Sequence, residues 1–496
     1  MIVEHPAPAL VPGRNCRRVE NATRVAVIID AADYFEALRE AMLAAERQIL
    51  LVGWDFDTRV LIDRRDRPDS APLTIGEYIL WLADRRPDLC INILVWNLGL
   101  LSLARRGRNM IDALRWRWHP RIQLQTDSYH PLGGSVHHKL AVIDDRVAFC
   151  GGIDITTDRW DSPRHASPDP QRCNPDGKPY APWHDVALAV EGPVAAALGD
   201  LARDRWQRAV GAVIDPPPPT SRTPWPPQLE ADFRNVDVAI ARTRPAFHDD
   251  DEIREIEQLF VDLIAGAERL IYVENQYFAS RRIAEAIAMR LAEPSGPEIV
   301  VVNPATSSGW LAEAAMGSAR ATLLKVLGVT TGFERFRIYT PVADDRTPIY
   351  VHAKLMIVDD RVLRIGSANF NNRSMALDGE CDLALSVDQN DRPSITALRE
   401  RLLAEHLGCT AADVAQAFRA SESLIGCIEA LRGKARTLEP FVPEPISAFV
   451  QTVAGLEILD PERVGDAFEP LAKRSLVRNL WRLRFRRPPQ AGAGKA

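Results

Sequence analysis

The chain has 496 residues, which is too long for one ordinary hydrophobic core and favours two or more domains. Hydrophobic residues make up 46% of it and charged residues 26%, so a collagen-like, fibrous or wholly disordered protein is excluded. The net charge of −6 provides no overall attraction to nucleic acid, although a local basic patch is compatible with it.

The cysteines and the N-terminal residues show no sign of a disulfide-linked, exported or membrane-spanning protein. Seven cysteines are scattered without a CxxC pair, so we expect free thiols and neither a disulfide framework nor a zinc site. The first residues contain Glu4, His5 and three prolines where a Sec signal needs a basic residue and an apolar run. No stretch reaches the roughly 18 uncharged apolar residues of a spanning helix. We therefore expect a cytoplasmic or peripheral membrane protein, with non-classical secretion left open.

Strand-like and helix-like patterns alternate along the chain. In the first part, apolar runs predict strands at 50–56, 91–97, 121–126, 140–143 and 185–190 and a closing helix at 193–210. The later part repeats this order, with strands at 272–278, 299–303, 336–340, 355–358 and 380–385 and a helix at 395–407. This alternation predicts an α/β sandwich in each part, with helices covering a sheet.

A gap-free internal repeat relates the two parts. The segment 136–154 (VHHKLAVIDDRVAFCGGID) lies over 351–369 (VHAKLMIVDDRVLRIGSAN) at a constant offset of 215 residues, with nine of 19 positions identical. Between the copies, seven of the twelve residues 216–227 are prolines, which disfavour helices and sheets and predict a stiff linker. We therefore expect a duplicated domain, with two similar halves related by pseudo-two-fold symmetry.

These patterns divide the chain into four segments. We expect an N-terminal half at 1–215, a proline-rich linker at 216–228, a C-terminal half at 229–410 and a helical extension at 411–496. Near its end, residues 473–487 (KRSLVRNLWRLRFRR) contain seven basic residues and no acid. This composition is typical of a helix lying on an anionic membrane surface, and a solvated or docked C-terminal helix is the alternative.

Each half carries the pattern His-x-Lys-x4-Asp, followed by Gly-Gly or Gly-Ser. Because side chains of a strand alternate between its faces, a histidine and a lysine two residues apart point the same way. Two copies of this pair in a repeated frame predict a catalytic site formed by His137, Lys139, Asp144, His352, Lys354 and Asp359. His138 lies between two motif residues, so we expect it to face the core.

These motifs resemble the paired HKD motifs of the phospholipase D superfamily. The resemblance covers about residues 25 to 407, and the blocks GGIDI, PWHDV, IYVENQYF and GSANFNNRSM look like its eukaryotic-type, phosphatidylcholine-hydrolysing branch. It implies a bilobed α/β enzyme with one active site between the halves, in a short chain of bacterial type without PX, PH or C2 domains. It also implies a covalent phosphohistidine and no required metal or other cofactor.

The resemblance implies His137 as the nucleophile and His352 as the general acid, although the near-symmetry of the motifs leaves their order open. Imidazoles in such roles need a carboxylate that fixes tautomer and orientation. Asp185 and Glu380 occupy equivalent positions in the two halves and are the expected orienting acids, with surface charge as the alternative.

Further polar residues are expected around the phosphate. The motif lysines, together with Ser367, Asn369 and its counterpart Asp154, would surround the phosphoryl oxygens. Asp144 and Asp359 are expected to hold the motif loops by salt bridges instead of touching substrate.

Polar residues at the end of an otherwise apolar strand suggest contact with substrate, and a packing role is the alternative. The candidates for positioning substrate are Glu274, Asn275, Gln276 and, from a long loop of the first half, Trp160. His184 precedes Asp185, and alternation predicts that it faces away from the site.

A phosphodiester repels nucleophiles and releases a poor alkoxide, and two histidines can divide these tasks. One neutral imidazole attacks phosphorus while the other, protonated, donates to the leaving oxygen, which is worth ~10²–10⁴-fold in rate. Histidine can take both roles near pH 7 without an extreme pKa shift.

We therefore expect a phospholipase D that hydrolyses phosphatidylcholine or phosphatidylethanolamine to phosphatidic acid and the headgroup alcohol, with transphosphatidylation. The expected partners are a glycerophospholipid and a membrane surface, without nucleic acid, and a monomer suffices because both motifs lie in one chain. The alternatives are a cardiolipin synthase-like phosphatidyltransferase, a nuclease-type phosphodiesterase, which the net charge of −6 disfavours, and an inactive membrane-binding scaffold.

Overall fold

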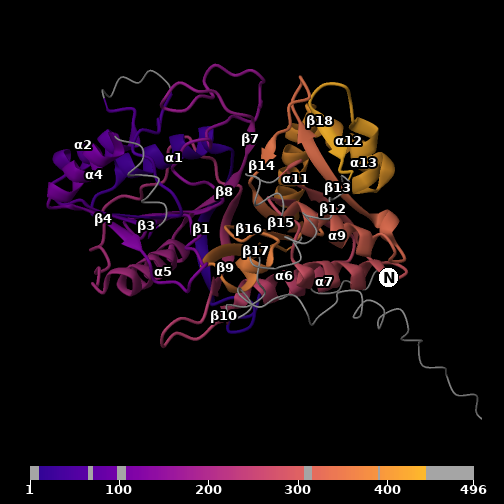
Figure 1. Ribbon diagram of the computed structural model, residues 1–496, viewed down its shortest axis with the longest axis horizontal. Helices are drawn as coiled ribbons and strands as arrows, with labels where there is room; N and C mark the ends of the chain where they lie inside the picture. Colours follow the sequence, from indigo (N-terminus) through magenta and orange to yellow (C-terminus); the bar gives the residue numbers. More distant parts are fainter. Residues whose placement is uncertain (1–9, 65–70, 98–107, 307–315, 389–390, 443–496) are drawn as a thin grey trace, which may run out of the picture.

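The computed structural model describes residues 10–64, 71–97, 108–306, 316–388 and 391–442. Within these ranges the chain folds into two α/β halves that share one continuous sheet, with helices packed on both of its faces (Figure 1). The expected α/β class with two similar halves is confirmed.

The first half extends from β1 to α5. Its strands are β1 (Arg18–Ile29), β2 (Gln48–Gly53), β3 (Cys90–Trp96), β4 (Ile122–Asp127), β5 (Leu140–Ile143), β6 (Val147–Gly151), β7 (Trp183–His184) and β8 (Val186–Glu191). Its helices are α1 (Ala31–Ala44), α2 (Ile75–Arg85), α4 (Arg108–Trp118) and α5 (Pro193–Val210).

The second half repeats this order from β9 to α11. Its strands are β9 (Phe233–Arg244), β10 (Ile253–Arg254), β11 (Leu270–Asn275), β12 (Glu298–Val302), β13 (Phe336–Val342), β14 (Tyr350–Val351), β15 (Lys354–Val358), β16 (Val362–Gly366) and β17 (Glu380–Ser386). Its helices are α6 (Glu255–Ala265), α7 (Arg281–Leu291), α9 (Ser318–Leu327), the 3-10 helix η2 (Phe333–Arg335), α10 (Asn372–Ala376) and α11 (Arg392–Leu407).

The sheet order shows the pseudo-symmetry directly. From the central antiparallel pair β1–β9, one side continues as β8-β6-β5-β2-β3-β4 and the other as β17-β16-β15-β11-β12-β13. On both sides the three outer strands are parallel to one another and the remaining neighbours are antiparallel, so the sheet is mixed. The two halves therefore meet along β1 and β9. Each of these two strands is paired on both sides, so no strand edge is exposed at the junction.

Three clusters of buried apolar residues fill the layers. One lies under α1 and α2 in the first half, and another lies under α6 and α7 in the second. The third runs across both halves on the opposite face, where it includes residues of α5, α11 and the central strands. This shared core joins the halves into one body, because side chains from both pack against each other there.

The segments beyond the two halves are partly described. Residues 216–228 form neither helix nor strand and connect α5 to β9. The C-terminal extension contains α12 (Ala411–Ser421), α13 (Leu424–Leu431) and also a strand, β18 (Thr437–Pro440), which pairs antiparallel with β13. The expected helical extension therefore also adds a strand to the sheet, and the basic tail at 473–487 lies outside the described residues.

All seven cysteines are free thiols, as the sequence predicts. Among the described helices, each is too short or too polar to traverse a bilayer.

The motif aspartates close two equivalent tight turns. Asp144 accepts hydrogen bonds at 2.7–2.8 Å from the backbone N–H groups of residues 46, 47 and 48. Asp359 accepts from those of residues 268, 269 and 270 at 2.7–2.9 Å. Both aspartates have positive φ, 53° and 55°, which aspartate tolerates better than most residues. Asp144 and Asp359 were expected to hold the motif loops by salt bridges, and this expectation is wrong about their partners. Each carboxylate instead accepts hydrogen bonds from backbone N–H groups at the start of the neighbouring strand.

We predict that Asp359→Ala lowers the free energy of unfolding by about 2–4 kcal/mol, because three backbone N–H groups lose their acceptor. The more conservative Asp359→Asn, which keeps one oxygen acceptor, should lose less. Chemical denaturation measures both, and Asp176→Ala, at an exposed aspartate paired with Lys178, is the matched control with little effect. Equal stability of Asp359→Ala and the control would contradict this role.

Candidate active site

Two short parallel bridges between the halves carry the motif histidines. In the first, β14 pairs with β7, and the backbone N–H of His352 donates to the carbonyl oxygen of His184 at 2.7 Å. In the second, Val136 bridges Gly379, and the N–H of His137 donates to the carbonyl oxygen of Gly379 at 2.8 Å. Each histidine is thus fixed on the backbone of the opposite half.

The two orienting carboxylates are exchanged between the halves. Nδ1 of His352 lies 2.7 Å from Oδ2 of Asp185, a residue of the first half. Nδ1 of His137 lies 3.0 Å from Oε2 of Glu380, a residue of the second half. Both acids therefore contact a motif histidine, and the exchange follows from the parallel register, which places each acid beside the opposite motif.

The motif glycine makes room for one of these carboxylates. A Cβ atom at Gly152 would lie 2.0 Å from Oδ1 of Asp185, closer than any real contact. That oxygen accepts a hydrogen bond from the N–H of Val186 at 2.8 Å, which leaves Oδ2 for His352. Glycine is required here by close approach to a side chain.

Hydrogen-bond partners determine the tautomer of His137. Its Nδ1 lies 3.0 Å from the backbone carbonyl oxygen of Ser367 as well as 3.0 Å from Glu380. A carbonyl oxygen only accepts, so Nδ1 carries the hydrogen and Nε2 keeps its lone pair. An imidazole held in this way can attack phosphorus or take a proton through Nε2.

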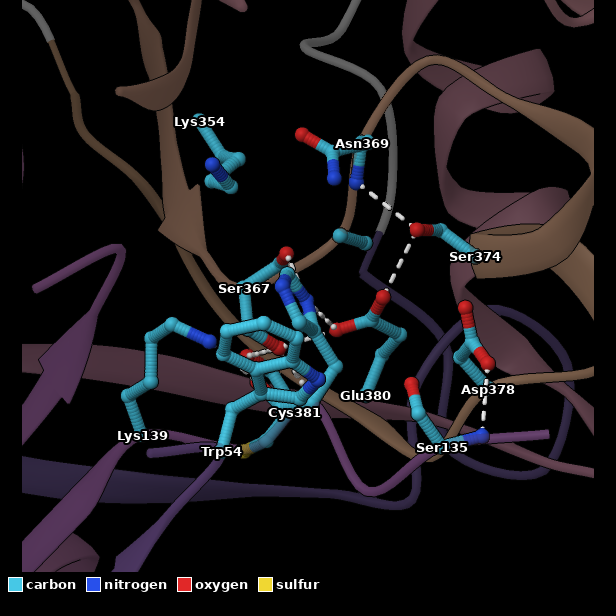
Figure 2. Close-up of polar contacts among 12 residues, drawn as sticks. Trp54, Ser135, Lys139, Lys354, Ser367, Asn369, Ser374, Asp378, Glu380 and Cys381 are labelled. Atoms are coloured by element: carbon cyan, nitrogen blue, oxygen red, sulfur yellow. Dashed lines mark hydrogen bonds and ion pairs between the residues drawn. The ribbon is translucent and has the colours of Figure 1, made fainter. Parts of the chain in front are cut away.

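Hydroxyl groups hold Glu380 in place (Figure 2). Ser367 donates to Oε2 of Glu380 at 2.5 Å and Ser374 donates to Oε1 at 2.6 Å. Ser367 also accepts from the N–H of Cys381 at 3.0 Å and is fully buried. The sequence places Ser367 at the phosphate, but its hydroxyl is engaged by Glu380, so it supports the orienting acid.

Lys139 and Asp154 form a buried ion pair next to His137. The Nζ atom of Lys139 lies 3.1 Å from Oδ2 of Asp154 and donates to the carbonyl oxygen of His137 at 3.0 Å. Oδ1 of Asp154 accepts from the backbone N–H of Trp54 at 3.0 Å. Asp154 was predicted at the phosphate, and the structure instead places it on the lysine, whose ammonium it positions.

Lys354 is fully buried and is held from both sides. It donates to the carbonyl oxygen of His352 and, at 3.2 Å, to Oε1 of Gln276. The amide nitrogen of Gln276 donates to the hydroxyl of Tyr350 at 3.0 Å. In Figure 2, Lys354 and Asn369 lie on the same side of the cluster around Glu380. Asn369 is buried, and among the described residues its Oδ1 has no hydrogen-bond partner.

The electrostatics indicate that the two motifs act on each other. Burial lowers the pKa of His137 well below its usual value, and Lys139 and Lys354 lower it further. Burial also lowers the pKa of His352 well below that value, and Lys354, Arg159 and Lys139 add to the effect. Both lysines thus influence both imidazoles, as in a single site. A bound anionic phosphate would offset these cations and raise the pKa of the imidazoles, which prepares one of them to donate a proton.

Two neighbouring groups titrate near neutrality. Burial lowers the pKa of Lys354 to about 7, against the carboxylate of Asp185, which raises it. Burial raises the pKa of Glu380 to about 8, and the carboxylate of Asp378 adds to the rise. Protonation of this site is therefore sensitive to pH between about 6 and 9.

Comparisons with known proteins agree with these motifs. A family model described as Phospholipase D matches residues 336–453, which include the second motif. Phospholipase D alpha 1 of Nicotiana tabacum is 24% identical over 75% of this chain and 64% of its own length. Phospholipase D2 of Bos taurus is 24% identical over 74% of this chain and 50% of its own length. The chain is thus similar in sequence to phospholipase D proteins, and its second motif lies within the match to their family model.

A solved structure supports the fold described above. The phosphatidylserine synthase of Haemophilus influenzae Rd KW20 aligns with a TM-score of 0.55 and 14% identity, over 78% of this chain and 88% of that protein. Phospholipase D A of Dictyostelium discoideum is 24% identical over 77% of this chain, which spans only 35% of that relative's length. The chain therefore spans between about a third and two thirds of the length of these relatives.

The three polar residues at the end of β11 have different positions in this phospholipase D-like site. Gln276 contacts Lys354, as described above. Asn275 accepts from the backbone N–H groups of Tyr277 at 3.1 Å and Phe370 at 2.9 Å, so it holds loops. Glu274 is fully buried and contacts two histidines and a tyrosine outside the motifs. The prediction that Glu274 positions substrate is corrected: it belongs to a separate polar cluster.

This second cluster joins β7, β11 and α11. Glu274 accepts from Nε2 of His184 at 2.8 Å and from Nε2 of His406 at 3.0 Å. Two overlapping groups have ligand atoms within 4.8 Å of one another and could hold a metal ion: Asp30, His165, His184 and Glu405, and His184, Glu274 and His406. His184 therefore lies away from the motif lysines, as alternation predicts, but it is the centre of a network that spacing along the chain could not reveal.

Trp160 also lies apart from the histidines. It is buried and lines a cavity of about 490 Å³, where the guanidinium of Arg64 lies 4.3 Å over its ring. The residues that line this cavity include none of the motif residues. The expected role of Trp160 in positioning substrate at the phosphate is therefore not supported by its place in the fold.

An aromatic pair lies beside His352, and its member Tyr350 was not predicted from the sequence. Trp183 stacks on Tyr350 with ring centroids 4.6 Å apart, and its centroid lies 5.1 Å from that of His352. The guanidinium of Arg159 lies 4.3 Å over the ring of Trp183. The available signal was alternation: Tyr350 lies two residues before His352, and Trp183 lies two residues before Asp185, so each pair shares one side of its strand.

We predict that kcat/KM for a phosphodiester falls as pH rises through about 7, because Lys354 loses its positive charge above its pKa. Asp185→Asn removes the carboxylate that raises this pKa, so the alkaline limb should move to lower pH as well as lose amplitude. Steady-state kinetics between pH 5.5 and 9 measure both, with Asp176→Asn as the exposed control. An alkaline limb at the same pH in Asp185→Asn and wild type would contradict the coupling.

Proposed function

We propose that this chain hydrolyses the distal phosphodiester bond of a glycerophospholipid, phosphatidylcholine or phosphatidylethanolamine, to phosphatidic acid and the headgroup alcohol. The observation that supports it most directly is the pair of imidazoles, each with Nδ1 on a carboxylate of the opposite half, beside two buried lysines. Relatives named phospholipase D support the same class of reaction.

The chemistry follows from these contacts. Nε2 of His137 attacks phosphorus, and its bond to phosphorus forms as the bond from phosphorus to the headgroup oxygen breaks. His352, protonated in the complex, gives its proton to that oxygen. In the second step neutral His352 takes a proton from water, the water oxygen bonds to phosphorus, and His137 leaves. The order of the two histidines follows the resemblance to the superfamily.

The buried lysines stabilise the charge that develops on the phosphoryl oxygens. Lys139 and Lys354 are 3% and 0% exposed, so they act in a medium of low polarity where an ionic contact is stronger than in water. Asp154 and Gln276 position the two ammonium groups. Every step is carried by side chains of the chain itself.

The same intermediate could pass the phosphatidyl group to an alcohol instead of water. A phosphatidyltransferase of the cardiolipin synthase type would use identical residues and differ only in the acceptor. The acidic net charge of −6 disfavours a nuclease-type phosphodiesterase. We propose that the chain acts as a monomer on lipid at a membrane surface, since both motifs lie in one chain.

The decisive experiment incubates the full chain with vesicles of phosphatidylcholine and phosphatidylethanolamine, in ethanol and chelator. We expect phosphatidic acid together with phosphatidylethanol, because a primary alcohol intercepts the phosphohistidine. Absence of both products would refute the proposal. Nicking of plasmid DNA without lipid turnover would favour the nuclease alternative.

We predict that His137→Ala and His352→Ala each reduce lipid turnover by at least about 10²-fold, because one removes the nucleophile and the other the proton donor. His248→Ala, at an exposed histidine outside the site, is the matched control and should retain turnover. Product formation by mass spectrometry measures all three. Loss of activity in only one of the two motif variants would contradict a mechanism with two histidines.

A further inference from the structure

Helix α4 exposes a row of large apolar side chains. Ile111 is 59% exposed, Leu114 is 52% exposed and Trp118 is 83% exposed. Residues three and four apart lie on the same face of a helix, so these three form one stripe, about 10 Å long. The buried face of the same helix carries Trp116 and Asp112, which are 1% and 7% exposed.

This clustering is specific to α4 among the described residues. The other exposed large hydrophobic side chains lie singly on separate segments, at Val11, Leu73, Leu132, Val213, Met289, Val329 and Val442. Single exposed apolar residues are ordinary, whereas a contiguous row on one helix is typical of an interaction surface.

The symmetry-related helix shows that the fold does not demand this stripe. α9 follows β12, as α4 follows β3, and these two strands hold equivalent places in the sheet. The exposed positions in α9 are Thr322 and Lys325, both polar. Since both helices cover the same place in equivalent halves, the apolar face of α4 is a property of its sequence rather than of the architecture.

Positive charge accompanies the apolar row. Arg115 and Arg117 are exposed in the last turn of α4. The neighbouring acid, Asp112, is buried and accepts a hydrogen bond from the hydroxyl of Thr58 at 2.6 Å. It also lies 3.8 Å from the guanidinium of Arg115, whereas Arg117 has no acid of α4 beside it in the described ion pairs. The exposed face of residues 111–118 is therefore apolar and cationic, although the whole chain carries a net charge of −6.

An anionic bilayer matches both properties of this face. Helices that lie on membranes combine apolar and tryptophan side chains, which enter the headgroup boundary, with arginines that pair with lipid phosphates. A second copy of the chain would match the apolar row but would place the arginines of two identical faces against each other. Figure 1 shows α4 at the outer end of the first half, beside α2 and away from the β1–β9 junction.

We propose that the face formed by Ile111, Leu114, Arg115, Arg117 and Trp118, the α4 face, docks the protein on an anionic lipid surface. The functional role of this docking rests on the proposed lipid substrate. Binding of the face to a bilayer can nevertheless be measured without turnover. The α4 face adds a membrane contact that is independent of the basic segment at 473–487, which stays intact in every variant below.

The first test measures binding without turnover. The full chain carrying His137→Ala is sedimented with vesicles of phosphatidylcholine alone or mixed with phosphatidylglycerol. Adding Ile111→Ser, Leu114→Ser and Trp118→Ser together should weaken binding to the mixed vesicles by at least about tenfold. Val329→Ser, at a 75% exposed valine just after α9, is the matched control and should bind like the parent. Equal binding by the triple variant and the parent would overturn the proposal.

The second test separates charge from apolar contact. Arg115→Gln and Arg117→Gln should each weaken binding to anionic vesicles by about fivefold, because one basic residue near such a surface contributes on the order of 1 kcal/mol. Lipids brominated on the acyl chains should quench part of the tryptophan fluorescence, and Trp118→Phe should remove that part. Unchanged quenching in Trp118→Phe would contradict insertion of the α4 face.

The third test keeps the docking surface distinct from the proposed function. Turnover of a short-chain phosphatidylcholine below its micelle concentration should be the same in the triple variant and in the wild type. Vesicle binding without turnover of any lipid would refute the phospholipase reaction and leave the α4 face standing. If the wild type is a dimer, the triple variant a monomer, and vesicle binding is the same in both, the face is instead an interface between copies.

Discussion

The site depends on two imidazole–carboxylate contacts that are exchanged between the halves. His352 relies on Asp185 and His137 relies on Glu380, at 2.7 Å and 3.0 Å. Breaking either contact would remove a hydrogen-bond acceptor from Nδ1 and leave the imidazole less firmly held in its orientation. Neither half is therefore a complete site, and the continuous sheet and the shared core across β1 and β9 keep the two contacts in register.

The two motif histidines occupy pseudo-symmetric positions, but the residues around them differ. Beside His352 the paired backbone positions carry Trp183 and Tyr350. The corresponding bridge beside His137 is flanked by Ser135, whose N–H donates to a carboxylate of residue 378 at 2.8 Å. Besides the two lysines, Arg159 lowers the pKa of His352, whereas the carboxylate of Asp378 raises the pKa of His137. Such differences allow two chemically identical side chains to perform opposite tasks in one reaction.

The predictions that were corrected share a cause. Glu274 was interpreted from its place at a strand end, yet its partners come from β7 and α11, which are 90 and 132 residues away in sequence. Ser367 was predicted to donate to the phosphoryl oxygens, yet its hydroxyl donates to Glu380. Polar residues in apolar surroundings indicated that partners must be buried nearby, but local spacing could not say which ones.

The sequence by itself determined the duplication, the α/β class and the residues of the two motifs, because a gap-free repeat at offset 215 and strand alternation are local patterns. It also indicated the two acids that contact the histidines. Only the tertiary structure decided that these acids cross between the halves, and that Asp154 serves a lysine. The reason is physical: which buried groups pair depends on strand register and on contacts between distant segments, and these form only when both halves pack into one sheet.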